Sequence, residues 1–171
     1  DGPLVVSVSR LVPRKGMDVL IDAAVRLRPH VPGLTVAIAG RGRDSQRLAG
    51  RVAEHGAPVR LLGGLSDDDV PRLIGAADVF VMLCRNRWLG LEQEGFGIVF
   101  LEAAAAGVPS VAGRSGGSHE AVLDGRTGLV VDDPTDVDVV ASALGELIDD
   151  PARRAAMGAA ARLRAVEEFR Y

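Results

Sequence analysis

The chain has 171 residues, of which 47% are hydrophobic and 25% charged, a balance typical of one globular domain and unlike that of a disordered or membrane-spanning chain. Its formal net charge of −3 excludes a broadly basic surface, so we expect no nucleic-acid partner, and any bound anion must be held locally. The single cysteine, Cys84, excludes an internal disulfide and a thiolate metal cluster and is typical of a reducing compartment, which makes the cytoplasm the expected location.

Short β-branched runs alternate with longer amphipathic stretches, which predicts an α/β domain built from βαβ units. Strands are expected at Leu4–Ser9, Leu34–Ala39, Val59–Leu62, Val79–Met82, Ser110–Ala112 and Leu129–Val131. Helices are expected from Gly16 to about Leu27, Asp44–Glu54, the Ser66 N-cap to about Ala77, Ile98–Ala106, His119–Leu123, Val137–Ile148 capped by Thr135, and Pro151 to about Phe169 capped by Asp150. About six strands then form a Rossmann-like, doubly wound parallel sheet, which binds ligands beyond the carboxyl ends of its strands.

The chain starts almost directly with the first expected strand. Residues 1–3 (DGP) contain neither a charged region nor an apolar run of the kind that targeting signals have. This start indicates a cut within a longer protein.

The loop after the first strand carries three cations, Arg10, Arg14 and Lys15, where this fold binds ligands. Lys15 is the only lysine among 20 basic residues. It is either a chance survivor of an arginine bias or a lysine kept because a compact point charge is needed. Two cations beside a diphosphate would neutralise the charge that develops when a glycosidic bond breaks. A solvated basic loop is the alternative interpretation.

A second segment places two carboxylates, Glu94 and Glu102, on either side of a glycine-rich helix start. A phosphate could bind the free N–H groups over Gly97, Ile98 and Val99. Glu102 lies one helical turn beyond Ile98 and tilts back towards the same ligand. Apolar neighbours surround it and leave no evident solvated face, so its carboxylate needs hydroxyl or cationic partners. The alternative is a surface glutamate on a packed helix.

Two other ligand-binding motifs, a dinucleotide fingerprint and a metal site, do not fit this sequence. Gly40 and Gly42 follow a strand, but Ser45 stands where a dinucleotide fingerprint requires its third glycine. The three histidines, His30, His55 and His119, are far apart in the sequence and have no suitably spaced carboxylate or cysteine partners, so we expect no metal site.

These segments resemble the C-terminal domain of the retaining GT-B glycosyltransferases of group 1, the GT4 family, which includes bacterial mannosyltransferases. The Glu94-x7-Glu102 pattern is the hallmark of that family. Residues 9–16 (SRLVPRKG), 94–102, 107–109 (GVP), 115–117 (SGG) and 150–158 (DPARRAAMG) resemble the subgroup that transfers mannose from GDP-mannose to phosphatidyl-myo-inositol lipids. The resemblance covers nearly the whole chain.

The resemblance implies that residues 1–171 form the nucleotide-sugar donor domain and that an N-terminal acceptor domain is absent from this chain. It implies retaining transfer of a mannosyl group to a lipid or glycan, without a metal or other cofactor, by an enzyme at the inner face of the cell membrane. The implied catalytic residues are Arg10, Lys15 and Glu94. The implied donor contacts are Arg10 and Lys15 to the diphosphate, Glu102 to the ribose, Glu94 to the sugar, and the backbone of Phe96, Gly97, Ile98 and Val99 to sugar and phosphate.

Two other functions remain open. A non-hydrolysing sugar-nucleotide epimerase would also bind its substrate between two such domains, and a nucleotide-sensing module would need this half alone. The presence of both Glu94 and Glu102 favours glycosyl transfer.

Overall fold

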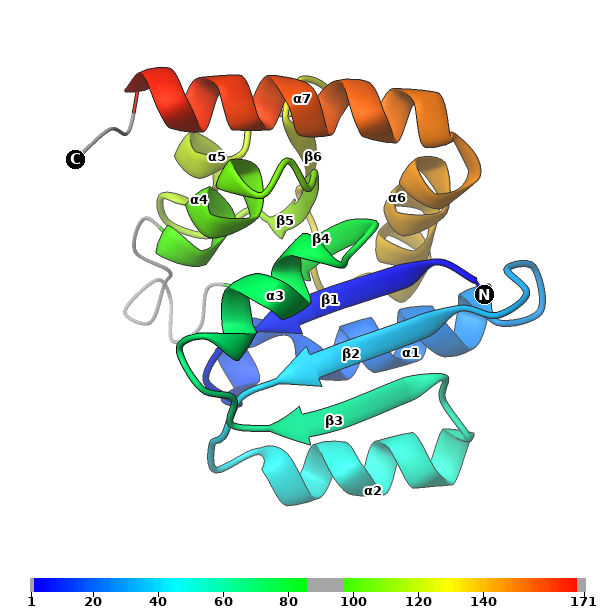
Figure 1. The fold of residues 1–171 in the computed structure, drawn as a ribbon. Coiled ribbons are helices and arrows are strands. Elements are labelled where there is room, and N and C mark those ends of the chain that lie inside the picture. Colours follow the sequence, from blue (N-terminus) through cyan, green and yellow to red (C-terminus); the bar gives the residue numbers. More distant parts are fainter. Residues whose placement is uncertain (1, 86–96, 169–171) are drawn as a thin grey trace.

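The computed structural model describes residues 2–85 and 97–168 (Figure 1). Within these residues the strands are β1 (Leu4–Val8), β2 (Thr35–Ala39), β3 (Val59–Gly63), β4 (Val79–Met82), β5 (Ser110–Gly113) and β6 (Gly128–Val131). The helices are η1 (Pro13–Lys15, 3-10), α1 (Met17–Leu27), α2 (Ser45–His55), α3 (Asp69–Gly75), α4 (Ile98–Ala105), α5 (Ser118–Ala121), α6 (Val137–Asp149) and α7 (Pro151–Glu168). Each expected strand and helix is therefore present, with boundaries shifted by a few residues.

The strands described form one parallel sheet in the order β3-β2-β1-β4-β5-β6. The expected Rossmann-like, doubly wound fold is confirmed. The first strand of the chain is central, because β1 pairs with β2 on one side and with β4 on the other. The strand order reverses between β1 and β4, and the carboxyl ends of these two strands border the crevice where such sheets bind ligands.

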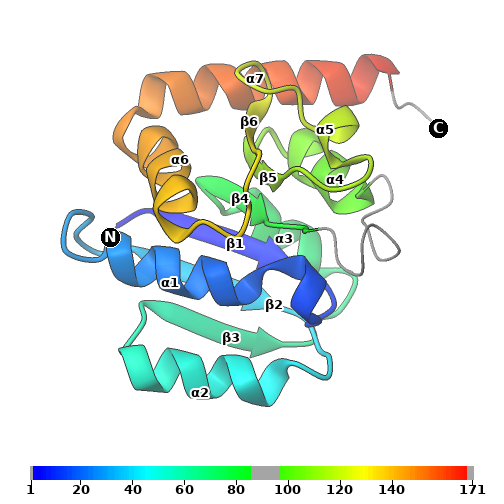
Figure 2. The same cartoon turned by 180° about the vertical axis from the view of Figure 1, so that it is seen from behind.

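Helices cover both faces of the sheet. Helices α1 and α6 pack together on one face, and α3, α4 and α5 lie over the other, as the opposite views in Figures 1 and 2 show. Two hydrophobic cores result: alternate residues of β1 point into them, Val5 into the first and Val6 into the second. Both residues are fully buried, as expected for a central parallel strand.

Helix α7 packs against α4 and α6 along one side of the molecule (Figure 1). A Cβ atom on Gly158 would lie 2.1 Å from the carbonyl oxygen of Gly107, the second residue after α4. A side chain at position 158 would therefore force the two segments apart. This contact supports the C-terminal end of α4, whose other end faces the crevice.

The predicted cap of α6 was wrong. The Asp136 carboxylate, and not Thr135, accepts the N–H groups of Asp138 and Val139, at 2.9 and 3.2 Å. The Thr135 hydroxyl instead donates to the Asp133 carboxylate at 2.6 Å, which takes it away from the helix.

The other two predicted caps make the expected kind of contact. Ser66 Oγ accepts the N–H of Asp69, although α3 itself begins only at Asp69. Asp150 Oδ1 accepts the N–H of Arg153, and Pro151 is the first residue of α7 as expected.

Candidate functional site

The turn after β1 packs directly against the end of β4. Gly16 closes this turn with φ +70°, and a Cβ atom at this position would lie 2.3 Å from the carbonyl oxygen of Leu83. Only glycine accepts both the left-handed backbone and this approach. The Arg85 N–H also donates a hydrogen bond to the Arg14 carbonyl at 2.9 Å, which links the turn to the residues that follow β4. The sequence thus fixes the cationic turn at the reversal of strand order.

Lys15 lies buried in this crevice, with 7% of its surface exposed. Its Nζ atom donates to the thioether Sδ of Met82, the last residue of β4, at 3.4 Å. A solvated basic loop is therefore excluded for Lys15. Burial strengthens the attraction between this ammonium and a bound anion, because less water screens the charge.

The start of α4 lies at the same place. Gly97 is its N-cap, with φ +73°, and a Cβ atom there would lie 2.8 Å from the Phe100 ring and 3.9 Å from Met82 Cε. Met82 thus contacts Lys15 with its sulfur and approaches the helix start with its methyl group. Met82 therefore links Lys15 to the segment that begins with Gly97.

The first turn of α4 offers backbone donors. The Phe100 N–H donates to the Gly97 carbonyl at 2.9 Å, and within the described residues no side chain caps this helix. The N–H groups of Ile98 and Val99 can therefore bind an anion, which the partial positive charge of the helix end also favours. Ile98 points outward and is 70% exposed, whereas Val99 packs against the core. An apolar side chain thus borders the candidate anion position on its open side.

Glu102 differs from the expectation in its surroundings. It is exposed, because α4 buries Phe100, Ala103 and Ala104 while Glu102 shares the outer face with Ile98. The inference that no solvated face exists was wrong. Neighbouring atoms still remove part of the hydration of its carboxyl group, and this raises the pKa of Glu102 above its usual value. Among the described residues it has no ion-pair partner, so its carboxylate can accept a ligand's hydroxyl groups.

Arg10 is exposed and borders a different part of the crevice. It lines an open pocket of about 430 Å³ beyond the ends of β1, β2 and β3, with Val8, Ser9, Ala39, Gly40, Arg41, Gly64, Leu65 and Val70. Two glycines allow this packing: Cβ atoms on Gly40 and Gly42 would lie 1.8 Å from the Ser9 carbonyl oxygen and 2.1 Å from that of Leu11. The Gly-Arg-Gly segment therefore supports the loop that carries Arg10.

Two predicted contact residues, Glu94 and Phe96, lie outside the described residues. Within residues 2–85 and 97–168, no three histidine, cysteine, aspartate or glutamate side chains are grouped as metal ligands would be. In the same part of the chain, every helix is too short or too polar to cross a bilayer.

The family model for glycosyl transferases group 1 matches residues 1–164. The chain belongs to this family. It is 51% identical over 176 aligned residues to a GDP-mannose-dependent alpha-(1-6)-phosphatidylinositol monomannoside mannosyltransferase of Mycolicibacterium smegmatis, an alignment that covers 100% of this chain and 45% of the relative. This group 1 chain therefore spans about half the length of that relative.

Solved structures show the same fold in other glycosyl transferases. HepE of Anabaena, crystallised with UDP-glucose, has a TM-score of 0.84 at 28% identity, covering 97% of this chain and 44% of HepE. The C-terminal domain of LpcC, a group 1 protein of Francisella tularensis, has a TM-score of 0.84 at 23% identity, covering 98% of this chain and 86% of that domain. The group 1 chain thus has the fold of a glycosyl transferase C-terminal domain.

One residue of the site was not singled out from the sequence. Met82 is buried, and its sulfur contacts Lys15. Its position at the carboxyl end of a strand beside the strand reversal was the signal that could have placed it at the site.

Proposed function

We propose that this chain is the donor-binding domain of a retaining mannosyltransferase that uses GDP-mannose. The observation that carries the proposal is the buried ammonium of Lys15 beside the open N-terminus of α4, at the reversal of strand order. Together they form a local anion site in a chain whose net charge is −3. The 51% identity to a GDP-mannose-dependent mannosyltransferase supports this donor.

In this proposal each part of the site contacts one part of the donor. Lys15 and the first N–H groups of α4 bind the diphosphate and neutralise the charge that the leaving nucleotide gains. Arg10 contributes a second cation from the adjoining pocket. Glu102 accepts hydrogen bonds from the ribose hydroxyls. Glu94 and the backbone near Phe96 contact the sugar, as the family resemblance implies.

Catalysis in this proposal requires a second domain, which supplies the acceptor site, and no metal or other cofactor. The chain spans 45% of its mannosyltransferase relative, which leaves room for such a domain. The acceptor hydroxyl must be oriented at the sugar in a cleft that excludes water, and one wall of a cleft provides neither. The relative's name points to a phosphatidylinositol mannoside as acceptor, and we place the whole enzyme at the cytoplasmic face of the membrane.

The test is calorimetry of this chain with GDP-mannose, GDP and UDP-glucose, followed by incubation with radiolabelled GDP-mannose and vesicles that contain phosphatidylinositol monomannoside. The chain should bind GDP-mannose more tightly than UDP-glucose and should make mannolipid only when the N-terminal domain is added. Mannolipid formed by the chain alone would refute the two-domain proposal. Failure to bind any nucleotide would refute the donor site, and epimerised sugar nucleotide would favour the epimerase.

A further inference from the structure

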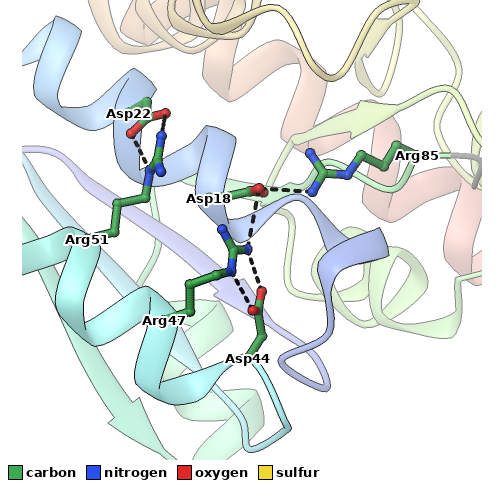
Figure 3. Close-up of polar contacts among 6 residues, drawn as sticks. All are labelled: Asp18, Asp22, Asp44, Arg47, Arg51 and Arg85. Atoms are coloured by element: carbon green, nitrogen blue, oxygen red, sulfur yellow. Dashed lines mark hydrogen bonds and ion pairs between the residues drawn. The ribbon is translucent and has the colours of Figure 1, made fainter.

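A chain of ion pairs connects three segments beside the candidate site (Figure 3). Asp18, the second residue of α1, accepts a hydrogen bond from Arg85 Nη2 at 2.9 Å. The same carboxylate oxygen also accepts from Arg47 Nη2 of α2 at 3.4 Å. Two further bonds, at 2.6 and 2.7 Å, fix the Arg47 guanidinium to Asp44. The central carboxylate is therefore held from both sides.

Arg85 is tied to the cationic turn twice. Its side chain reaches Asp18 at the start of α1, and its backbone N–H donates to the Arg14 carbonyl at 2.9 Å. Arg14 directly precedes Lys15 in the sequence, and Asp18 lies three residues after it. These two contacts involve residues on either side of Lys15 in the sequence, and they hold the turn that carries Lys15 to the segment that follows β4.

The Asp18–Arg85 ion pair is shielded from water, so it can contribute to holding the turn in place. The two side chains are only 18% and 19% exposed, so water screens this pair less than it screens an ordinary surface ion pair. Burial alone would raise the pKa of Asp18, but the hydrogen bond and charge of Arg85 and the charge of Arg47 hold it below the usual range. The carboxylate therefore stays charged at neutral pH, and its place in the first turn of α1 adds a favourable helix-dipole contact.

We propose that Asp18 is a positioning residue of the donor site: through Arg85 it holds the turn that carries Lys15 against the end of β4, and so keeps Lys15 Nζ at Met82. The nucleotide measurements below rest on the proposed function, whereas the spectroscopic measurement does not. Asp18 itself need not touch the donor, because its effect passes through Lys15.

The structure offers a matched control in the neighbouring pair Asp22–Arg51. This pair also joins α1 to α2 with two hydrogen bonds, one of them from Arg51 Nε at 2.7 Å (Figure 3). It has a similar exposure, 22% and 35%. It differs from the Asp18 pair in one respect: neither partner makes a hydrogen bond or ion pair with residues 83–85, the described part of the segment that follows β4. Asp22→Asn therefore removes an equivalent contact between the two helices and leaves the contacts of Arg85 with Asp18 and Arg14 in place.

The first measurement is NMR of the chain labelled with ¹³C at its methionine methyl groups, without nucleotide. The sequence has three methionines, and Met82→Leu identifies the resonance of Met82. Asp18→Asn should shift that resonance, while Asp22→Asn should leave it in place. Arg85→Gln, which keeps the Asp18–Arg47 contact, should reproduce the shift and serves as the second variant if Asp18→Asn fails to fold. An unmoved Met82 methyl in both Asp18→Asn and Arg85→Gln would overturn the proposal.

The second measurement is calorimetry with GDP. Asp18→Asn should weaken GDP about tenfold, since a misplaced ammonium loses most of a charge-assisted contact. In a Lys15→Ala background the same substitution should change the Kd less than about twofold, because both substitutions then affect one contact. Equal loss of affinity in Asp18→Asn and Asp22→Asn would indicate a purely structural role and overturn the inference. Absence of GDP binding in the unsubstituted chain would instead refute the proposed function.

Discussion

Lys15 Nζ lies 3.4 Å from Met82 Sδ, so the only ammonium side chain of the protein is buried against a thioether at the junction of the two sheet halves. Burial removes much of the hydration of this ammonium and strengthens its attraction for a nearby anion. The arrangement favours an anion in the crevice, and the proposed diphosphate has the required charge.

Replacing Lys15 should weaken the contacts with the phosphates of the ligand and not those with its base. Lys15→Ala should weaken GDP by about 10-fold to 100-fold and guanosine little, because a charged hydrogen bond contributes about 1.5–3 kcal/mol. Lys15→Arg should not restore binding, since a planar guanidinium does not place its charge as a compact ammonium does at this buried position. Titrations with GDP and guanosine at low and high salt measure this, and Arg126→Ala, an exposed arginine before β6, is the control. Equal losses for the two ligands would contradict the diphosphate contact.

Gly97→Ala should damage both stability and binding. Alanine at φ +73° costs about 1 kcal/mol, and its Cβ atom would also lie 2.8 Å from the Phe100 ring. Gly125→Ala is a matched control, with φ +71° and open space around the added atom. Urea unfolding should show a larger loss for Gly97→Ala, and calorimetry should show weaker GDP binding for that variant alone. Equal destabilisation by the two substitutions would indicate that the ring moves aside without cost.

Glu102→Gln should weaken GDP binding by about 1–3 kcal/mol, because charge-assisted hydrogen bonds to the ribose become neutral ones. Partial burial raises the pKa of Glu102, so on acidification the unsubstituted chain should start to lose affinity at a higher pH than an ordinary glutamate would allow. The Gln variant should lack this loss. Calorimetry across the acid range measures both effects. Glu94→Gln should spare GDP, and equal effects of the two substitutions would contradict the division of roles.

The raised pKa of the Glu102 carboxyl group also affects the free energy of unfolding. The contribution of Glu102 to stability is present below its unfolded pKa and is lost as the pH rises through its higher folded pKa. At neutral pH its charge therefore opposes folding, and Glu102→Gln should be at least as stable as the unsubstituted chain in urea. Loss of stability in this variant would mean that its weaker GDP binding reflects misfolding.

Asp18 should have the opposite dependence. Its folded pKa lies below the ordinary 3.8, so its contribution is present above that value and is lost as the pH falls through the folded pKa. Unfolding of the unsubstituted chain and of Asp18→Asn, followed by circular dichroism from neutral to strongly acidic pH, should therefore show a difference in stability that narrows below about pH 4. A difference that stays constant with pH would contradict a role for the ionised carboxylate.

The cap of α6 gives a prediction away from the site. Asp136→Ala should lower the free energy of unfolding by about 1 kcal/mol, because its carboxylate accepts two N–H groups at the helix start. Thr135→Ala should cost less, since its hydroxyl contacts Asp133 and not the helix. Urea unfolding of both variants measures the difference. The reverse order would return the cap to Thr135.

The strand pattern and the site's main groups were predictable because they depend on local sequence. β-Branched runs placed the strands, and the positions of Lys15 and Gly97 after strands placed them at the carboxyl edge of the sheet. The cap of α6 was missed because Thr135 and Asp136 are adjacent and both are good cap formers, so the choice depends on where the Asp133 carboxylate lies.

Other features depend on contacts between distant segments. Glu102 is exposed because the sheet and α7 cover the other faces of α4. This helix is largely apolar, so the hydrophobic periodicity of residues 98–105 is too weak to show which face is covered. The Asp18–Arg85 pair joins residues 67 apart, so no local spacing indicates it. The contact between Lys15 and Met82 is equally distant in the sequence.

The central position of β1 has a consequence for synthesis. β1 leaves the ribosome before the other strands, yet one of its edges pairs with β4, and the Leu4 N–H bonds to Asp78, 74 residues later. At about 5–20 residues per second, that edge stays unpaired for roughly 4 to 15 seconds. An unpaired apolar edge is a template for other chains, so the nascent polypeptide is open to pairing with them during this interval.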